Sequence, residues 1–281
     1  MLQFQIQAKS LLTIVLACAI ALSPASLRAQ ELPAETVAGW NLYVQLTESR
    51  IERELGSRDH FFAFEFQAPP KARSERASIL SGEVTVAKMQ TRKKDGRAVP
   101  VPGGKIHHWR GAVFIPNISL QSLLEAARQI DGQAHRQEDV LESKVLEQGD
   151  DSARIYLRLT RRHIVRATYN TEHLVRFRRI DPERAASRSM ATRIAELANA
   201  GTRMESEKPP DGDRGFLWRL NSYWRYRQVA EGVLVECESL SLSRSIPAIA
   251  APVINPIVDS VARESMTRTL ASMKRRFQEG G

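Results

Sequence analysis

Two neighbouring segments near the end of the chain carry the residues best suited to bind a small molecule. In residues 215–227 and 233–243, side chains of two kinds alternate, which is typical of strands with two different faces. On the apolar face we single out Trp218, Trp224, Tyr226 and Cys237. Ligand pockets are mostly apolar with a few orienting polar groups, so this face is a candidate pocket wall. Plain core packing against a helix produces the same alternation and is the simpler interpretation.

The other face of the same two segments is charged. Arg225 and Arg227 alternate with the apolar side chains of the first segment, and Glu236 and Glu238 with those of the second. Arg–Glu pairs between the two strands are therefore expected. We interpret this face as exposed to solvent, where each such pair contributes about 0–1 kcal/mol.

Histidine, cysteine and the local motifs offer little support for catalysis or metal binding. His107 and His108 are adjacent, and adjacent side chains of a strand point to opposite faces, so the two do not chelate one ion. Cys237 shares its face with Val233 and Val235, where a thiol behaves as a small apolar side chain. The chain has no Gly-x-Ser-x-Gly, His-Glu-x-x-His or Cys-x-x-Cys motif, phosphate loop or dinucleotide fingerprint. We expect no metal, no other cofactor and no catalytic residue, although an acid and a base that meet only in the folded chain remain an alternative.

The first 29 residues have the pattern of a cleavable secretory signal. Lys9 precedes an apolar run at residues 11–22, and small residues lead to Ala29. The run is too short for a helix across a bilayer, which takes about 20 residues. An uncleaved anchor is one alternative, and a lipoprotein acylated at Cys18 is another, although the apolar run continues past that cysteine. We predict an exported protein, periplasmic or secreted, with residues 1–29 as its signal peptide.

The chain is basic. Its formal net charge is +9, and removal of residues 1–29 lowers this to +7 because two cations and no acidic residue are lost. A basic surface suits nucleic acid, anionic lipid or solubility alone, and export makes nucleic acid the least suitable partner. Arg154, Arg158, Arg162 and Arg166 recur at four-residue steps. They could contact an anionic membrane surface, but a face exposed to solvent is the simpler interpretation.

The mature chain is expected to rely on a hydrophobic core, because Cys237 would be its only cysteine and no internal disulfide can form. We divide it into residues 30–104, a helix and strands that cover the main domain, and residues 105–281, the main domain. For the first part the patterns predict a helix over residues 33–56, a strand over 61–67 that ends at Pro69-Pro70, and a strand over 79–91.

The main domain begins with an extended segment over residues 105–116 and a helix over 120–131. The strands predicted after it span residues 142–147, 153–162, 164–169, 173–180, 189–197, 215–227 and 233–243. So many strands without helices between them indicate an antiparallel sheet. Residues 252–278 have apolar positions at helical spacing, among them Met266, and cations in the last turn. We therefore predict an α+β protein with a long C-terminal helix, and we add Met266 to the candidate ligand-binding residues.

Several segments resemble the START-like, Bet v 1-like superfamily, to which polyketide cyclase-like proteins also belong. They are residues 111–116 before the first helix of the main domain, residues 140–145 after it, the hairpin around Trp218 and the terminal helix. Residues 105–111, 215–224 and 235–239 are also similar to segments of an uncharacterised group of exported bacterial proteins. One departure from the superfamily is Gly132-Gln133-Ala134-His135-Arg136, where an aromatic residue and a proline are common.

The resemblance implies a helix-grip, in which a curved sheet wraps around the last helix, and a cavity between them for a lipid or another apolar molecule. It implies a carrier or binding protein whose ligand contacts Trp218, Trp224, Tyr226, Cys237 and Met266. Because fold does not determine function, two alternatives stay open. One is a cyclase or hydrolase on the same fold, and the other is a cell-envelope interaction protein without a ligand. The oligomeric state is not predicted.

Overall fold

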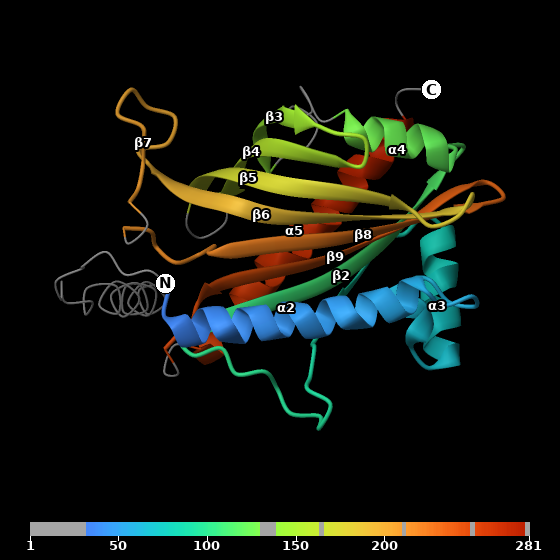
Figure 1. Cartoon of the computed structure of the whole chain (residues 1–281), viewed down its shortest axis with the longest axis horizontal. Coiled ribbons are helices and arrows are strands. Elements are labelled where there is room, and N and C mark those ends of the chain that lie inside the picture. The colour runs from blue at the N-terminus through green and yellow to red at the C-terminus, as the bar shows by residue number, and fades with distance from the viewer. Residues whose placement is uncertain (1–31, 130–138, 163–165, 210–211, 248–250, 279–281) are drawn as a thin grey trace, which may run out of the picture.

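The computed structural model describes residues 32–129, 139–162, 166–209, 212–247 and 251–278. These residues form an antiparallel sheet with helices on both of its faces (Figure 1). The predicted α+β class, with the sheet gripping a long C-terminal helix, is confirmed. The predicted signal peptide and residues 132–136 lie outside the described residues.

The sheet is continuous from edge to edge. Its strands follow the order β1 (Thr85–Lys88), β2 (Gly104–Pro116), β9 (Gly232–Arg244), β8 (Arg219–Val229), β6 (Arg184–Ala198), β5 (Arg166–Arg179), β4 (Ser152–Arg162) and β3 (Val140–Gln148), and β7 (Ser206–Glu207) pairs with β6. Two segments that we predicted as separate strands, residues 164–169 and 173–180, are not separate in the part that is described, since residues 166–169 and 173–179 both belong to the single strand β5. A register shift against β6 between Glu172 and His173 locally interrupts the pattern of alternation.

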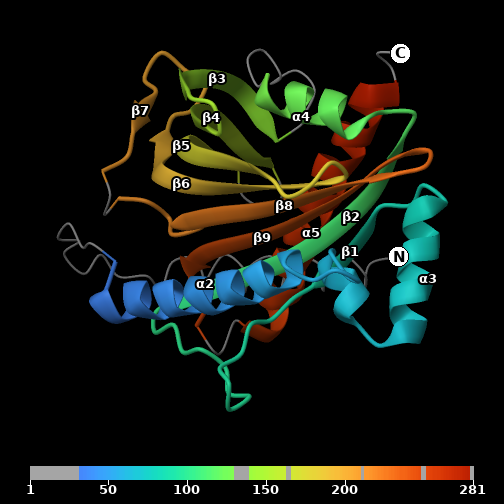
Figure 2. The same ribbon diagram turned by 45° about the vertical axis from the view of Figure 1, so that its right-hand side comes forward.

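Helix α5 (Ala251–Gln278) lies on one face of the sheet, which we call the α5 face (Figure 2). Its Met266 and Leu270 are buried against β2. Gly111 makes this approach possible, because a Cβ atom there would lie 2.6 Å from Leu270 Cδ1 and 2.8 Å from Met266 Cγ. Helix α4 (Leu120–Arg128) contributes Leu120 and Leu123 to the same cluster.

Helix α2 (Ala34–Leu55) crosses the opposite face, which we call the α2 face (Figures 1 and 2). Its buried stripe includes Trp40, Tyr43, Ile51 and Leu55, which recur at the helical spacing that the sequence predicted. At the far end of α2, Arg184 of β6 donates a hydrogen bond to the Ser57 carbonyl at 2.9 Å. The two faces of the sheet therefore have separate cores.

The segment between α2 and β1 differs from its prediction. Residues 61–67 are not a strand but contain the 3₁₀ helix η1 (Ala63–Phe66). The N–H groups of this segment donate to side-chain carboxylates and not to a neighbouring strand. Glu65 accepts from the N–H groups of Phe61 and Phe62, and Glu236 accepts from that of Ala63 at 2.8 Å. Pro69-Pro70 opens the helix α3 (Pro69–Leu80) instead of ending a strand, because proline suits the first turn of a helix. Only Thr85–Lys88 of the strand predicted over 79–91 is extended in the sheet.

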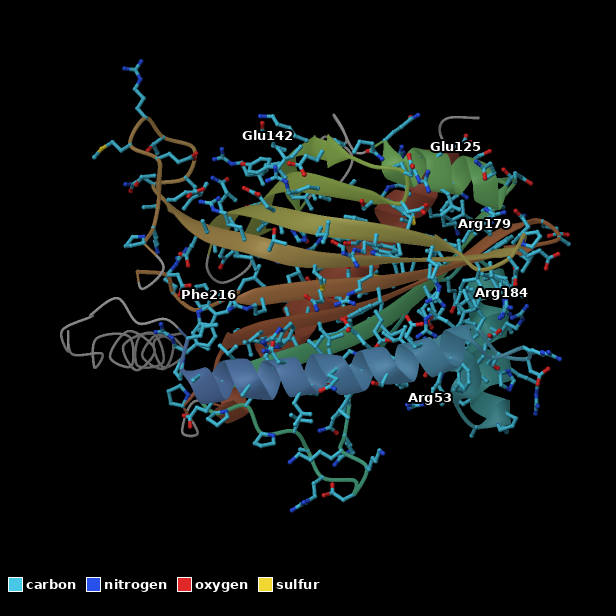
Figure 3. The ribbon with its side chains drawn as sticks, in the orientation of Figure 1. Arg53, Glu125, Glu142, Arg179, Arg184 and Phe216 are labelled. Carbon is cyan, nitrogen blue, oxygen red and sulfur yellow. The ribbon has the colours of Figure 1, made fainter. Side chains whose placement is uncertain are left out.

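None of the described helices combines the length and the apolar character needed to cross a membrane. Figure 3 shows Phe216 near one end of the sheet and Arg179 and Arg184 near the other. The division of the chain at residue 104 stays a prediction.

Candidate functional site

Four of the five predicted ligand-binding residues come together on the α5 face. Tyr226, Cys237 and Met266 are buried in one apolar cluster, and Trp224 is half-buried at its border. The rings of Trp224 and Tyr226 are stacked with their centroids 6.4 Å apart. Trp218 lies apart, because it precedes β8 and packs against the cluster under α2. Its indole Nε1–H donates to Asp213 Oδ1 at 3.3 Å.

Helix α5 buries only part of its face of the sheet. Beyond Trp224, several apolar side chains that point to this face are only half-buried, among them Leu157 of β4 and Leu220 of β8, although Ala153, Ile155 and Val175 form a small buried cluster there. Apolar side chains inside a fold normally lose nearly all their exposure. This part of the α5 face is therefore open to solvent or to another molecule.

A row of serine side chains crosses this open part. Ser189 of β6 lies opposite Ser222 of β8, Ser222 lies opposite Ser239 of β9, and Ser239 lies opposite Trp109 of β2. Directly paired residues share a face of the sheet, so the three hydroxyls form a line, which we call the serine row. All three serines are half-buried. The row thus supplies polar groups beside Leu220 and Trp224, which flank Ser222 on β8, and we did not predict it from the sequence.

One end of the serine row is part of a directed chain of hydrogen bonds. The Thr171 hydroxyl donates to the Leu157 carbonyl at 2.9 Å, so it can only accept from His173, whose Nε2 is 2.9 Å away. Burial lowers the pKa of His173 to about 4, so the ring is neutral at pH 7 and its Nδ1 is an acceptor. Ser189, whose Oγ is 3.3 Å from Nδ1, therefore donates to His173. The lone pairs of Ser189 are left for a partner on the α5 face.

The two adjacent histidines point to opposite faces, as the sequence predicted. His107 lies on the α5 face and His108 on the α2 face, where His108 Nε2 is 2.6 Å from Glu238 Oε1 and its Nδ1 is 2.8 Å from the Tyr43 hydroxyl. In the described part of the chain, no group of three or more His, Cys, Asp or Glu side chains could hold a metal ion.

The charged face of β8 and β9 is buried, and our prediction that it is exposed to solvent is wrong. Arg225, Glu236 and Glu238 each have 1% of their surface exposed, because α2 and η1 cover them. Arg225 lies 3.7 Å from Glu236 and 3.8 Å from Glu238, so the predicted pairs exist. Its shortest ion pair is with Glu54 of α2, at 2.6 Å.

More charged side chains extend this network under α2, η1 and α3. Arg50 of α2 pairs with Glu238, Arg110 of β2 pairs with Glu75 at 2.6 Å, and Arg227 pairs with Glu65 at 3.0 Å. Buried charges need partners of this kind, since an unpaired one is strongly destabilising. The network therefore holds the N-terminal helices on the sheet.

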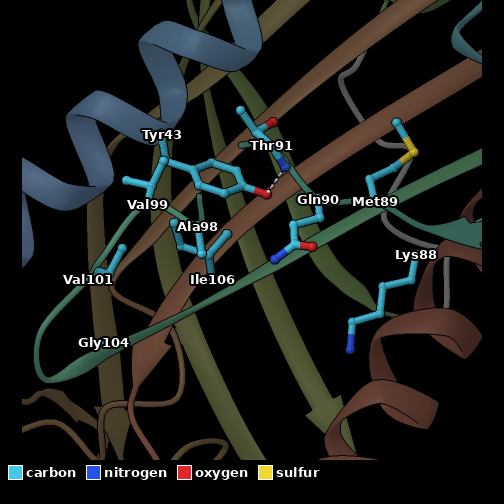
Figure 4. A pocket seen from close by; sticks show the side chains of 10 residues that line it. All are labelled: Tyr43, Lys88, Met89, Gln90, Thr91, Ala98, Val99, Val101, Gly104 and Ile106. Atoms are coloured by element: carbon cyan, nitrogen blue, oxygen red, sulfur yellow. Dashed lines mark hydrogen bonds between the residues drawn. The ribbon is translucent and has the colours of Figure 1, made fainter. Parts of the chain in front are cut away.

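A pocket of about 580 Å³ lies at the edge of the sheet beside α2 (Figure 4). It is lined by Tyr43, Gly104, Ile106 and residues 88–91, 98, 99 and 101, and none of the predicted ligand-binding residues is among them. The Tyr43 hydroxyl accepts a hydrogen bond from the Thr91 N–H at 2.8 Å, and burial raises its pKa. Since its hydroxyl is already engaged by Thr91 and His108, Tyr43 serves to anchor α2.

The four arginines at four-residue steps lie on two strands, with Arg154, Arg158 and Arg162 on β4 and Arg166 at the start of β5. Arg154 pairs with Glu147 at 2.5 Å and with Glu172 at 3.1 Å, and Arg158 pairs with Glu205. The side chains of Arg162 and Arg166 lie outside the described part. The two arginines that are described thus have acidic neighbours, which weakens the attraction that they would exert on an anionic membrane.

No family model matches the chain, and no curated protein matches it either. Solved structures do resemble it. A STAR-related lipid transfer protein from Xanthomonas axonopodis is 15% identical, with 69% of this chain and 98% of that chain covered and a TM-score of 0.45. A START superfamily protein from Mycobacterium smegmatis is 8% identical over 62% and 97% of the two chains, with a TM-score of 0.41. The ZhuI aromatase/cyclase from a Streptomyces species is 13% identical over 63% and 94%, with a TM-score of 0.38. The first two of these proteins are named as STAR-related or START proteins, and all three matches concern the fold alone.

Proposed function

We propose that this protein is an exported binding protein that holds a small, mainly apolar molecule between the α5 face of the sheet and α5. The observation that carries the proposal is the set of half-buried apolar side chains, Leu157, Leu220 and Trp224, on a face that α5 covers only in part. Covering such side chains with an apolar ligand is favourable by about 25 cal/mol for each Å² of apolar surface removed from water.

The neighbouring groups support a ligand that is apolar with a few polar atoms. Trp224 and Tyr226 present a stacked pair of rings at the border of the buried cluster, and the serine row lies across the strands beside them. This combination of an apolar wall with a few hydroxyls is typical of small-molecule sites. Each methylene group that such a site removes from water contributes about 0.8 kcal/mol.

The same face favours binding over catalysis. The hydrogen bond from Ser189 to His173 resembles the first step of nucleophile activation. However, burial lowers the pKa of His173 to about 4, and a general base works best when its pKa is near the working pH. His173 therefore orients the Ser189 hydroxyl but is a weak base for removing its proton.

Export rests on the signal pattern of residues 1–29. The full chain, expressed with its leader in a Gram-negative host, is expected in the periplasmic fraction with an N-terminus near Gln30. Retention of the full-length chain in the cytoplasm or the inner membrane would contradict this part of the proposal.

Native mass spectrometry with lipid extraction tests the binding role. The mature protein, purified from its exported compartment, is expected to carry an apolar species of defined mass. Trp224→Ala should lose that species, whereas Phe66→Ala should keep it, because Phe66 is an exposed aromatic residue at the end of η1 on the other side of the sheet. A wild-type protein free of any bound apolar molecule would contradict the proposal.

A further inference from the structure

Beyond the serine row, the α5 face holds a buried hydrogen-bond donor without an acceptor. Trp109 follows Ser239 in the row and has 8% of its surface exposed. Its indole Nε1–H has no hydrogen-bond partner in the described part of the chain. Buried polar groups are nearly always paired, so this donor calls for a partner that the described part of the chain does not supply.

His107, the next residue of β2 on the same face, offers a buried acceptor. The Ser243 hydroxyl donates to the Arg244 carbonyl at 3.2 Å, so it accepts from His107 Nε2–H at 2.9 Å. His107 Nδ1 then carries a lone pair, and no described group donates to it. Burial, aided by Lys105, lowers the pKa of His107 to about 4, against the opposing effect of Asp259. The ring is therefore neutral at pH 7, and Nδ1 remains an acceptor.

Helix α5 contributes a second acceptor at the same place. Asp259 Oδ2 is 2.6 Å from Lys88 Nζ, while Asp259 Oδ1 is buried and has no partner among the described residues. Lys88 Nζ in turn lies 6.0 Å from the centre of the Trp109 ring, and Figure 4 shows Lys88 beside α5. The salt bridge thus brings the Asp259 carboxylate to the Trp109 end of the serine row.

A hydroxyl group has the donor and the acceptor that this set calls for. Its oxygen can accept from Trp109 Nε1–H, and its proton can go to His107 Nδ1 or to Asp259 Oδ1. A carboxylate would pair with the Trp109 N–H, but it would bring only lone pairs and a negative charge to the two acceptors. An ether or ester oxygen would leave both acceptors unpaired.

We propose that Trp109, His107 and Asp259 form the site for a hydroxyl group of the ligand, so that the molecule bound on the α5 face is an apolar alcohol. This inference rests on the proposed binding function and specifies its ligand class. The apolar part of the molecule would extend along the serine row toward Leu220 and Trp224, which are half-buried.

Three probes with the same chain test the assignment by isothermal titration calorimetry on the delipidated mature protein: 1-decanol, decyl methyl ether and decanoate. The alcohol should bind about tenfold more tightly than the other two, which corresponds to one hydrogen bond of about 1.4 kcal/mol. Equal affinity of the three probes would overturn the hydroxyl site but leave the binding function standing. Tighter binding of decanoate would overturn the alcohol class in favour of an acid. No binding of any probe would contradict both.

A conservative variant separates the site from general packing. Trp109→Phe keeps an aromatic ring but removes the N–H, and it should remove most of the preference for 1-decanol over the ether. Trp40→Phe makes the same change in the core under α2, and it should leave the preference intact. If Trp109→Phe lowers the stability of the empty protein but leaves the preference unchanged, a trapped water molecule is the natural partner of Trp109 and the proposal is wrong.

Discussion

Arg225 of β8 and Glu54 of α2 form a buried ion pair of 2.6 Å across 171 positions of the chain. The Arg225 guanidinium also donates to the Phe61 carbonyl at 2.8 Å. A charge that is buried this deeply depends on its partners, since no water is there to replace them. Helix α2 is therefore an integral part of the core on the α2 face of the sheet.

Loss of either partner should be strongly destabilising. Arg225→Met or Glu54→Gln is expected to lower the free energy of unfolding by about 3–5 kcal/mol, because the buried charge that remains loses its shortest ion pair. The double variant should lose less than the sum of the two single losses. Urea unfolding measures all three.

The pair Arg178–Glu52 is the matched control, because it joins the sheet to the same helix at 2.8 Å but is largely exposed. Arg178→Met should cost less than about 1 kcal/mol. Equal losses for Arg178→Met and Arg225→Met would refute the structural role that we assign to the buried network.

The two buried glutamates of β9 should respond to acid in opposite ways. Burial raises the pKa of Glu238, but His108, Arg50 and Arg225 outweigh it and lower the pKa to about 2, below the unfolded value of about 4.3. Its contribution to stability is thus present above about pH 4.3 and is lost as the pH falls toward 2. Burial raises the pKa of Glu236 despite Arg225 and Arg110, so its contribution is present at low pH and is lost as the pH rises.

Urea unfolding between pH 2 and pH 7 tests this difference. Glu238→Gln should make stability less sensitive to acid than in the wild type, and Glu236→Gln should make it more sensitive. Parallel pH profiles for both variants would show that the two carboxyl groups titrate alike, contrary to their environments.

For these carboxylates, the sequence predicted which face of the sheet they share but not what covers that face. The alternation along β8 and β9 correctly predicted which side chains share a face, and the pair Arg225–Glu236 followed from it. What lies on that face could not be predicted, because α2 and η1 come from a part of the chain more than 150 positions earlier. One signal was available, since the helix pattern of residues 34–55 has an apolar stripe that needs a surface to cover.

The serine row was missed for a similar reason. Ser239 and Ser241 stand at alternate positions of one strand, and that spacing was visible in the sequence. The alignment of Ser239 with Ser222, Ser189 and Trp109 depends on the register between strands, which tertiary pairing determines. Trp218 was placed with Trp224 because the alternation was extended beyond the start of β8 at Arg219.

Gly111 sets the distance between α5 and the sheet. Gly111→Ala would place a methyl group 2.6 Å from Leu270 Cδ1, and the resulting displacement of α5 should cost about 1–3 kcal/mol. Gly56→Ala is the control, because its Cβ would meet no atom closer than 3.5 Å. In the Gly111→Ala variant, Leu270→Ala should lower the free energy of unfolding by less than it does in the wild type. Urea unfolding measures both losses.

The tautomer of His173 is a direct consequence of the hydrogen bonds on the α5 face. Nitrogen NMR should show a neutral ring with its proton on Nε2 and a pKa of about 4. Thr171→Val removes the acceptor of that proton and should populate the Nδ1–H form as well. A ring that titrates near pH 6.5 in the wild type would contradict the burial of His173.

The location of the bound molecule tests the central claim most directly. A decanol analogue with a diazirine on its chain, irradiated in complex with the mature protein, can be mapped by peptide mass spectrometry. We predict that it labels β8 and β9 at Leu220, Ser222, Trp224 or Ser239, and that unlabelled 1-decanol competes. Labelling confined to Tyr43, Val99 and Ile106 would place the ligand in the pocket beside α2 and contradict our account.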